Sequence, residues 1–182
     1  MSKNAVIVVD LQNDYLPTGK LPLAGIDAAL GNAARVIAGA RAKGEPVFHV
    51  RHEFLQADAA FFAPGSAGAQ IHPAVAPQEG EAVILKHSPN SFLKTDLKEQ
   101  LDAAGIEAVT IVGAMSHMCI DATARGASDF GYRVTVVDDA CATRDLEFRG
   151  QTVPAAQVHA AQMSALAFAY ATVVDTEAWL AA

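Results

Sequence analysis

The sequence predicts a doubly wound α/β fold, in which a six-stranded parallel sheet has helices on both faces as a Rossmann-like three-layer sandwich. Short runs of β-branched and small apolar residues alternate with longer stretches in which apolar residues recur at helical spacing. Right-handed crossovers between parallel strands then place helices on both faces of the sheet. A chain of 182 residues has the length of one domain, which we expect to span residues 1–182.

Six segments have the composition of buried strands. In chain order they are residues 5–9, 46–50, 82–85, 108–112, 133–137 and 172–175. They are mostly β-branched or small and apolar, as expected when helices cover both faces of a parallel sheet.

Helical signals lie between these strands. Apolar residues recur at helical spacing from Ile26 until Gly44, and Thr95 is a candidate cap for a short helix that Gly105 ends. Pro154 opens a last predicted helix. One face of that helix is predicted to contain Val158, Ala161, Ala165 and Phe168.

A long segment without sustained periodicity separates the second and third strands. Residues 51–81 are rich in Ala, Pro and Gly. Loops longer than about 12–15 residues inside compact domains are usually functional, often as lids or binding loops. We therefore expect a functional role for this loop.

Charge and cysteine content limit the classes of function. Thirteen Lys and Arg against 20 Asp and Glu give a net charge of −7, which excludes a generally basic nucleic-acid-binding protein. The apolar run at residues 5–9 is too short for a signal-peptide core or a membrane span. Two cysteines do not form a disulfide framework. We expect a cytoplasmic protein with a small-molecule substrate and neither a nucleic-acid nor a membrane partner.

Cys119 lies where the strand at 108–112 passes into a helix of small residues that ends at Gly131. A thiol at a helix N-terminus meets unpaired backbone N–H groups and the positive end of the helix dipole, and both favour its thiolate form. Cys119 is therefore a candidate nucleophile. The alternative is a small buried hydrophobic residue, the more common role of a free cysteine. Cys141 has no adjacent base in the sequence and is predicted to be structural.

Two further strand ends supply candidate site residues. Asp10 follows the first strand, where open α/β sheets place their ligands, although it could instead cap the following turn. Lys86 follows the third strand, either as a cation in a cleft or as a solvated flank. Asp10, Lys86 and Cys119 share one edge of a parallel sheet. They are suited to covalent acyl transfer, which needs a thiol, a carboxylate to take its proton and a cation to hold the resulting charges.

Other chemistry of such folds does not match the strand ends. The first strand is not followed by Gly-x-Gly-x-x-Gly, and no Walker lysine loop is present, so dinucleotide and P-loop sites are excluded. Receiver domains of response regulators need a central phosphoacceptor aspartate, and the strand that ends at Lys86 offers none.

These residues resemble those of the isochorismatase-like cysteine hydrolases along nearly the whole chain. The motifs are Asp10-x-Gln12-x-Asp14, Lys86 with Asn90-Ser-Phe92, Gly113-Ala-Met-Ser-His-Met-Cys119 and Asp138-Asp-Ala. The resemblance implies a single hydrolase domain with a six-stranded parallel sheet that forms homodimers or homotetramers. Similar proteins include nicotinamidases, carbamoylsarcosine amidases, ureidoacrylate amidohydrolases and the vinyl-ether-cleaving isochorismatases.

The resemblance also implies a mechanism. Asp10 would remove the proton of Cys119, Lys86 would stabilise both anions, and the thiolate would attack an amide, ureide or carbamoyl carbonyl to form an acyl thioester. Asp10 would then activate water. A cis peptide bond between Ala114 and Met115 is implied, which would aim the N–H of Met115 beside that of Cys119 as an oxyanion hole.

Departures from the family pattern concern metals and substrate. Metal-dependent nicotinamidases have an Asp-x-His pair and a further His after the second strand, whereas this chain has Arg51-His52-Glu53 and an isolated His72. A zinc site needs three or four convergent ligands, so we expect no metal and no other cofactor. The catalytic cysteine is absent from the isochorismatases themselves, so its presence favours amide cleavage. A vinyl ether hydrolase and a non-catalytic thiol- or ligand-binding module are the alternatives.

The substrate contacts of this chain are expected to differ from those of the best-known members. Ser116-His117 stands where the family often has Thr-Asp, and Asn90 replaces a common Ser. The predicted substrate-binding residues are Gln12, Arg51, Asn90 and His117. Arg51 and His117 could equally be solvated surface residues.

Overall fold

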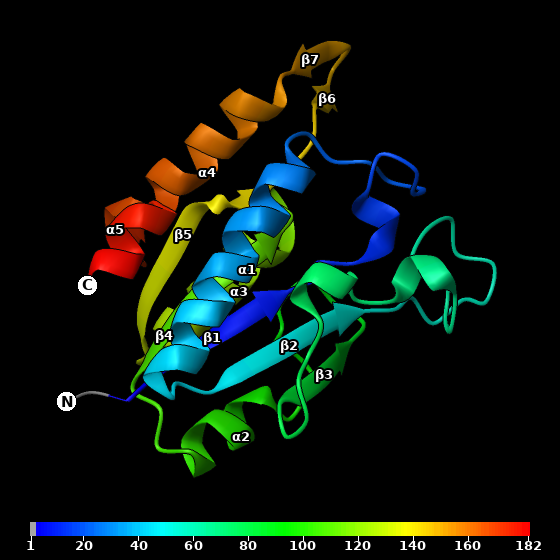
Figure 1. The fold of residues 1–182 in the computed structure, drawn as a ribbon. Coiled ribbons are helices and arrows are strands. Elements are labelled where there is room, and N and C mark those ends of the chain that lie inside the picture. Colours follow the sequence, from blue (N-terminus) through cyan, green and yellow to red (C-terminus); the bar gives the residue numbers. More distant parts are fainter. Residues whose placement is uncertain (1–2) are drawn as a thin grey trace.

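A computed structural model describes residues 3–182 of the chain (Figure 1). Its main sheet is parallel and six-stranded, in the order β3-β2-β1-β4-β5-β8, as the sequence predicted. These strands are β1 (Asn4–Val9), β2 (Val47–His52), β3 (Ala82–Lys86), β4 (Ala108–Ala114), β5 (Arg133–Ala142) and β8 (Thr172–Val174). The doubly wound α/β fold is therefore confirmed.

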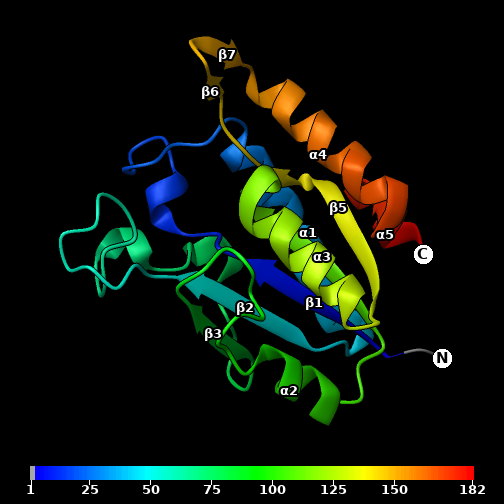
Figure 2. The same cartoon turned by 180° about the vertical axis from the view of Figure 1, so that it is seen from behind.

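Helices cover both faces of the sheet. They are α1 (Ile26–Lys43), α2 (Leu97–Ala103), α3 (Asp121–Asp129), α4 (Ala155–Ala169) and α5 (Thr176–Ala181). Helices α1 and α5 lie together on one face in Figure 1, and α2, α3 and α4 lie on the other, as the reverse view in Figure 2 shows. Because alternate residues of the strands pack against each layer, the core has two parts, one on each side of the sheet.

Two elements were not predicted. A two-stranded antiparallel hairpin of β6 (Leu146–Phe148) and β7 (Gln151–Val153) projects beyond the sheet before α4 (Figure 1), and α5 follows β8. The hairpin strands are short, largely exposed and partly polar, and a helix of six residues is shorter than two turns, so neither gives the pattern of a buried strand or an amphipathic helix.

The predicted face of α4 is right for Val158 and wrong for Ala161, Ala165 and Phe168, which are exposed. The helix begins after Pro154 as expected, but its buried residues are Val158, Met163 and Leu166, and Phe168 is 91% exposed. Apolar residues surround this helix on every side, so their spacing did not indicate which face packs on the sheet.

The strand order places the site. The chain adds β2 and β3 on one side of β1, then crosses back to add β4 and β5 on the other. Open α/β sheets bind ligands at the carboxyl ends of the strands where the order reverses. Here that point lies between β1, which Asp10 follows, and β4, which leads to Cys119.

Gly113 allows β1 and β4 to approach closely at this point. It pairs with Val9 and has a φ of 132°, and a Cβ at this position would clash with the Val9 carbonyl. Only glycine combines this conformation with this contact. The close approach of the two strands brings the segment that contains Cys119 next to the end of β1.

Among residues 3–182, no helix is long and apolar enough to cross a membrane.

Candidate active site

Four side chains from four strand ends meet at the carboxyl edge of the sheet. Asp10 follows β1, His52 ends β2, Lys86 ends β3, and Cys119 follows β4. Asp10 and Lys86 are fully buried, and Cys119 is 5% exposed. The structure therefore brings together the three side chains that the sequence predicted as catalytic, and adds a histidine.

Asp10 has the left-handed backbone conformation, with a φ of 52°, where the chain turns away from β1. Its N–H donates to the Val50 carbonyl at 2.9 Å, which holds the turn against β2. Such conformations cost of order 1–3 kcal/mol for residues other than glycine and cluster at functional sites. Burial raises the pKa of the Asp10 carboxyl, and the charge of Lys86 opposes this shift only in part. A carboxylate made more basic in this way is suited to accept a proton.

Lys86 is the centre of the cluster. Its Nζ lies 2.7 Å from Asp10 Oδ2, 3.0 Å from His52 Nδ1, 3.0 Å from the Ser88 carbonyl oxygen and 3.3 Å from Cys119 Sγ. Burial disfavours its charge, but the attraction of Asp10 and Cys119 outweighs burial and raises the pKa of Lys86. A side chain with no exposed area is not a solvated flank, so that alternative is wrong.

Cys119 lies in a π-helical turn, Ser116–Ile120, that leads into α3. Its helix position favours the thiolate, but other influences act in the opposite direction. Burial raises the pKa of Cys119, Asp10 raises it further, and Lys86 only partly opposes these effects. Cys119 therefore rests as a thiol beside a carboxylate, and its thiolate forms when Asp10 takes the proton.

The segment before Cys119 contains a non-proline cis peptide bond between Ala114 and Met115. The Met115 carbonyl accepts hydrogen bonds from the N–H groups of Met118 at 3.0 Å and Ile120 at 3.2 Å, which shapes the turn around Cys119. The oxyanion hole formed by the N–H groups of Met115 and Cys119 stays a prediction.

Comparisons with known proteins agree with this geometry. The isochorismatase domain family matches residues 4–178. This chain belongs to the isochorismatase family. It is 49% identical to the isochorismatase family protein YddQ of Bacillus subtilis over 176 residues. These residues are 97% of this chain and 98% of that protein. The crystal structure of an isochorismatase hydrolase from Oleispira antarctica is 56% identical, covers 100% of this chain and 97% of its own, and has a TM-score of 0.96.

Further relatives are named as amide-cleaving enzymes. Maleamate amidohydrolase of Pseudomonas putida is 30% identical over 159 residues, 78% of this chain and 73% of that protein. A nicotinamidase of Arabidopsis thaliana and an N-carbamoylsarcosine amidase of Thermoplasma acidophilum are also similar. The predicted family is therefore confirmed, and the chain is an isochorismatase-family hydrolase.

The four predicted substrate-binding residues of this hydrolase each have a partner within the chain. Gln12 donates both amide hydrogens, to the carbonyls of His52 and Ala69, and its own carbonyl accepts from the His52 N–H. At 1% exposure it holds the end of β2 to the loop that follows, and its contact with substrate stays a prediction.

The other three predicted contacts bind neighbouring groups. Arg51 pairs with Glu53. The side-chain oxygen of Asn90 accepts a hydrogen bond from the Phe92 N–H at 3.0 Å. His117 Nδ1 lies 2.6 Å from Thr143 Oγ1. None of these contacts reaches Asp10, Lys86 or Cys119. Their contact with substrate stays a prediction.

His52 is the site residue that sequence reasoning missed. It follows Arg51, which is the residue of this pair that the sequence analysis assigns to the site. The signal was the alternation along β2, since His52 shares its strand face with Phe48 and Val50 of the core that contains Cys119.

Asp10, His52 and Cys119 offer a carboxylate oxygen, a ring nitrogen and a sulfur within 4.8 Å of one another. A metal ion does not fit among them, because Lys86 Nζ already lies 2.7, 3.0 and 3.3 Å from one atom of each. The ammonium group is the cation that these side chains share.

We therefore predict that amide hydrolysis needs no metal. Dialysis of the protein against a strong chelator should leave the rate of ammonia release unchanged within experimental error. A loss of activity that zinc or iron restores, and magnesium does not, would contradict this.

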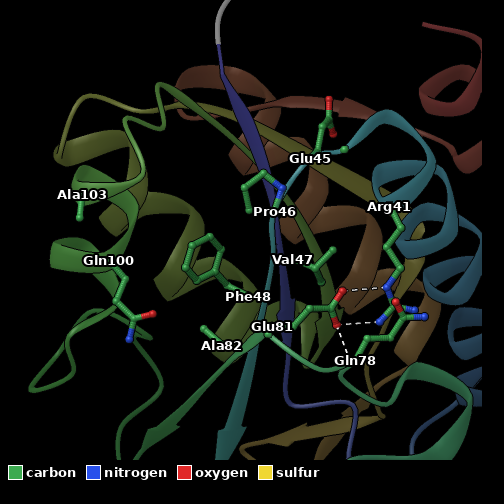
Figure 3. A pocket seen from close by; sticks show the side chains of 12 residues that line it. Arg41, Glu45, Pro46, Val47, Phe48, Gln78, Glu81, Ala82, Gln100 and Ala103 are labelled. Carbon is green, nitrogen blue, oxygen red and sulfur yellow. Dashed lines mark hydrogen bonds and ion pairs between the residues drawn. The ribbon is translucent and has the colours of Figure 1, made fainter.

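A hollow lies at the opposite edge of the sheet, between the starts of β2 and β3 (Figure 3). It has a volume of about 590 Å³. Glu81 on its wall pairs with Arg41, which lowers the pKa of the Glu81 carboxyl to about 2, and its carboxylate also accepts from the Gln78 N–H. These charged groups bind one another and are remote from Cys119.

Proposed function

We propose that this isochorismatase-family hydrolase cleaves the C–N bond of a small amide, ureide or carbamoyl compound through an acyl thioester on Cys119. The observation that carries the proposal is the buried contact of Lys86 with both Asp10 and Cys119 at 2.7 and 3.3 Å. A thiol, a base and a cation in mutual reach form the constellation of nucleophilic acyl transfer.

In the proposed reaction, Asp10 accepts the Cys119 proton as the sulfur attacks the substrate carbonyl. Lys86 stabilises the negative charge that passes from the carboxylate to the sulfur, and the N–H groups of Met115 and Cys119 stabilise the oxyanion. Asp10 returns the proton to the leaving nitrogen, which departs as ammonia or an amine. Asp10 then takes a proton from the water that attacks the thioester and passes it to the departing Cys119 sulfur, which releases a carboxylic acid, or a carbamic acid from a carbamoyl compound.

Two findings support amide cleavage over the vinyl ether alternative. The first is the Cys119 thiol, which acyl transfer uses as its nucleophile. The second is that similar proteins are named as a maleamate amidohydrolase, a nicotinamidase and an N-carbamoylsarcosine amidase. The family assignment argues against a thiol module without catalysis. A cytoplasmic location and a small-molecule substrate as partner complete the proposal.

The test is ammonia release from a panel of small primary amides, ureides and carbamoyl compounds that includes nicotinamide, maleamate and N-carbamoylsarcosine. At least one compound should release ammonia with the wild-type protein and not with Cys119→Ala. Release that is equal in both proteins, or release from none of the panel, would refute the proposal.

We also predict self-association, with the 51–81 loop near the contact. Phe168 is a second candidate for the contact, because it is 91% exposed on α4, a helix that contains no Asp, Glu, Lys or Arg. Sedimentation velocity at micromolar concentration should give a species of at least twice the 19.0 kDa chain mass. A single 19.0 kDa species would contradict the prediction.

A further inference from the structure

His52 is held firmly beside the nucleophile. His52 is 6% exposed, and in the sheet it lies opposite Lys86 of the adjacent strand β3. The side chain of Gln12 binds both the N–H and the carbonyl of His52, at 2.8 Å each. Its ring packs against Phe54 and Phe62, with centroid distances of 4.8 and 6.0 Å.

The contact with Lys86 determines which ring nitrogen of His52 carries the proton. His52 Nδ1 lies 3.0 Å from Lys86 Nζ, and an ammonium group can only donate. Nδ1 must therefore accept, so the proton of the neutral ring is on Nε2. Burial, together with the charge of Lys86, lowers the pKa of His52 to about 4, so the ring is neutral at pH 7.

The Nε2–H group of His52 has no partner. It is buried, and no acceptor within residues 3–182 reaches it. Leaving a buried donor unsatisfied costs free energy, and such groups call for an explanation such as a ligand. One ring nitrogen of His52 lies within 4.8 Å of Cys119 Sγ and of an Asp10 oxygen, so the ring borders the nucleophile.

We propose that the Nε2–H of His52 binds a second hydrogen-bond acceptor of the substrate, in addition to the carbonyl that Cys119 attacks. His52 then selects small amides that have another carbonyl, carboxylate or ring nitrogen close to the scissile amide. This inference rests on the proposed amide hydrolysis, and it assigns the recognition of substrate to a residue outside the catalytic three.

The first test uses the Cys119→Ala protein, which binds substrate without turnover. Malonamide has a second carbonyl, and propionamide of similar size has none. Long-range ¹H–¹⁵N spectra should show the Nε2–H tautomer of His52, and malonamide should shift its Nε2 resonance and bind at least tenfold more tightly than propionamide. The ring of His72, whose Nδ1 accepts from Ala74 N–H, is the internal control and should not shift. An Nδ1–H tautomer, equal binding of the two amides, or no binding of malonamide would overturn the proposal.

The second test separates the two ring nitrogens in the otherwise wild-type protein. His52→Asn places an acceptor near the position of Nδ1 and removes the Nε2 donor, whereas His52→Gln places a donor near Nε2 and removes the Nδ1 acceptor. With the best amide of the ammonia screen, His52→Asn should raise KM at least tenfold with kcat within threefold. His52→Gln should lower kcat and leave KM within threefold, and His72→Asn should change neither.

If both His52 variants show the same changes in kcat and KM, or if KM is unchanged in His52→Asn, the role of His52 is structural and the proposal is overturned. Thermal unfolding of each variant checks that it is folded, and the spectra of the Cys119→Ala protein decide the question if a variant is not. Failure of this inference leaves Cys119-dependent ammonia release intact. Failure of the proposed function removes that release for every amide, and malonamide binding still tests the role of His52.

Discussion

Replacing Cys119 with alanine should lower amide turnover by at least about 10⁴-fold, because no acyl thioester can form without the sulfur. The fold should persist. Cys119 belongs to the core on the α3 side of the sheet, and a cavity of methyl size there costs about 1 kcal/mol. The rate of ammonia release and the unfolding midpoint of the purified variant are the two measurements.

Cys141→Ala is the matched control. Cys141 is also a buried free cysteine, at 7% exposure against 5% for Cys119, and burial raises its pKa to about 12. It differs in having no contact with Lys86 among the hydrogen bonds of residues 3–182. Cys141→Ala should therefore keep most of the activity. Retained activity in Cys119→Ala together with its loss in Cys141→Ala would contradict the assignment.

Replacing Lys86 with methionine should lower turnover by about 10²–10³-fold, because the cation that stabilises the developing charge is removed. The loss of Lys86 also removes the influence that holds the pKa of Asp10 down, so the carboxyl takes up a proton and no longer acts as a base. Breaking a buried pair by removing one partner costs about 3–5 kcal/mol of stability. The control is Lys94→Met, which changes an exposed lysine eight positions further along and should alter neither activity nor stability.

A double variant separates the loss of activity from the loss of stability. Lys86→Met combined with Asp10→Asn removes both charges, so the free energy of unfolding should recover relative to Lys86→Met alone. Activity should not recover. If the double variant regains both, or if Lys86→Met is as active as Lys94→Met, Lys86 supports the fold and takes no part in catalysis.

Much of the fold could be predicted from the sequence because its strands are buried on both faces. The run from Ala5 to Val9 and the one from Ala108 to Val112 are continuous and β-branched, which distinguishes them from helices. The same reasoning did not identify the buried face of α4, because its apolar residues are spread around the helix. It also failed for the β6–β7 hairpin, whose short strands are largely exposed and contain polar residues, unlike the buried strands of the main sheet.

The catalytic three could be predicted because parallel strands end at the same edge, so that three strand ends imply one cluster. The protonation state of Cys119 could not. The sequence showed the helix that favours a thiolate, but not the burial of the site or the Asp10 charge beside the sulfur, and both of these raise the pKa of the thiol. The tautomer of His52 and the saturation of Gln12 depend on contacts across about 40 residues, which no local pattern contains.

The acyl thioester on Cys119 is the central claim, and mass spectrometry of the protein during turnover tests it most directly. Wild-type protein is mixed with an excess of the amide identified by ammonia release, quenched with acid within the first turnovers and digested. The peptide that contains Cys119 should gain the mass of the acyl group, hydroxylamine should remove it, and the peptide that contains Cys141 should be unchanged. Two results would contradict the account. One is an acyl group on the peptide that contains Cys141 during turnover by the wild-type protein. The other is rapid turnover by the Cys119→Ala protein, in which no peptide gains the mass of the acyl group.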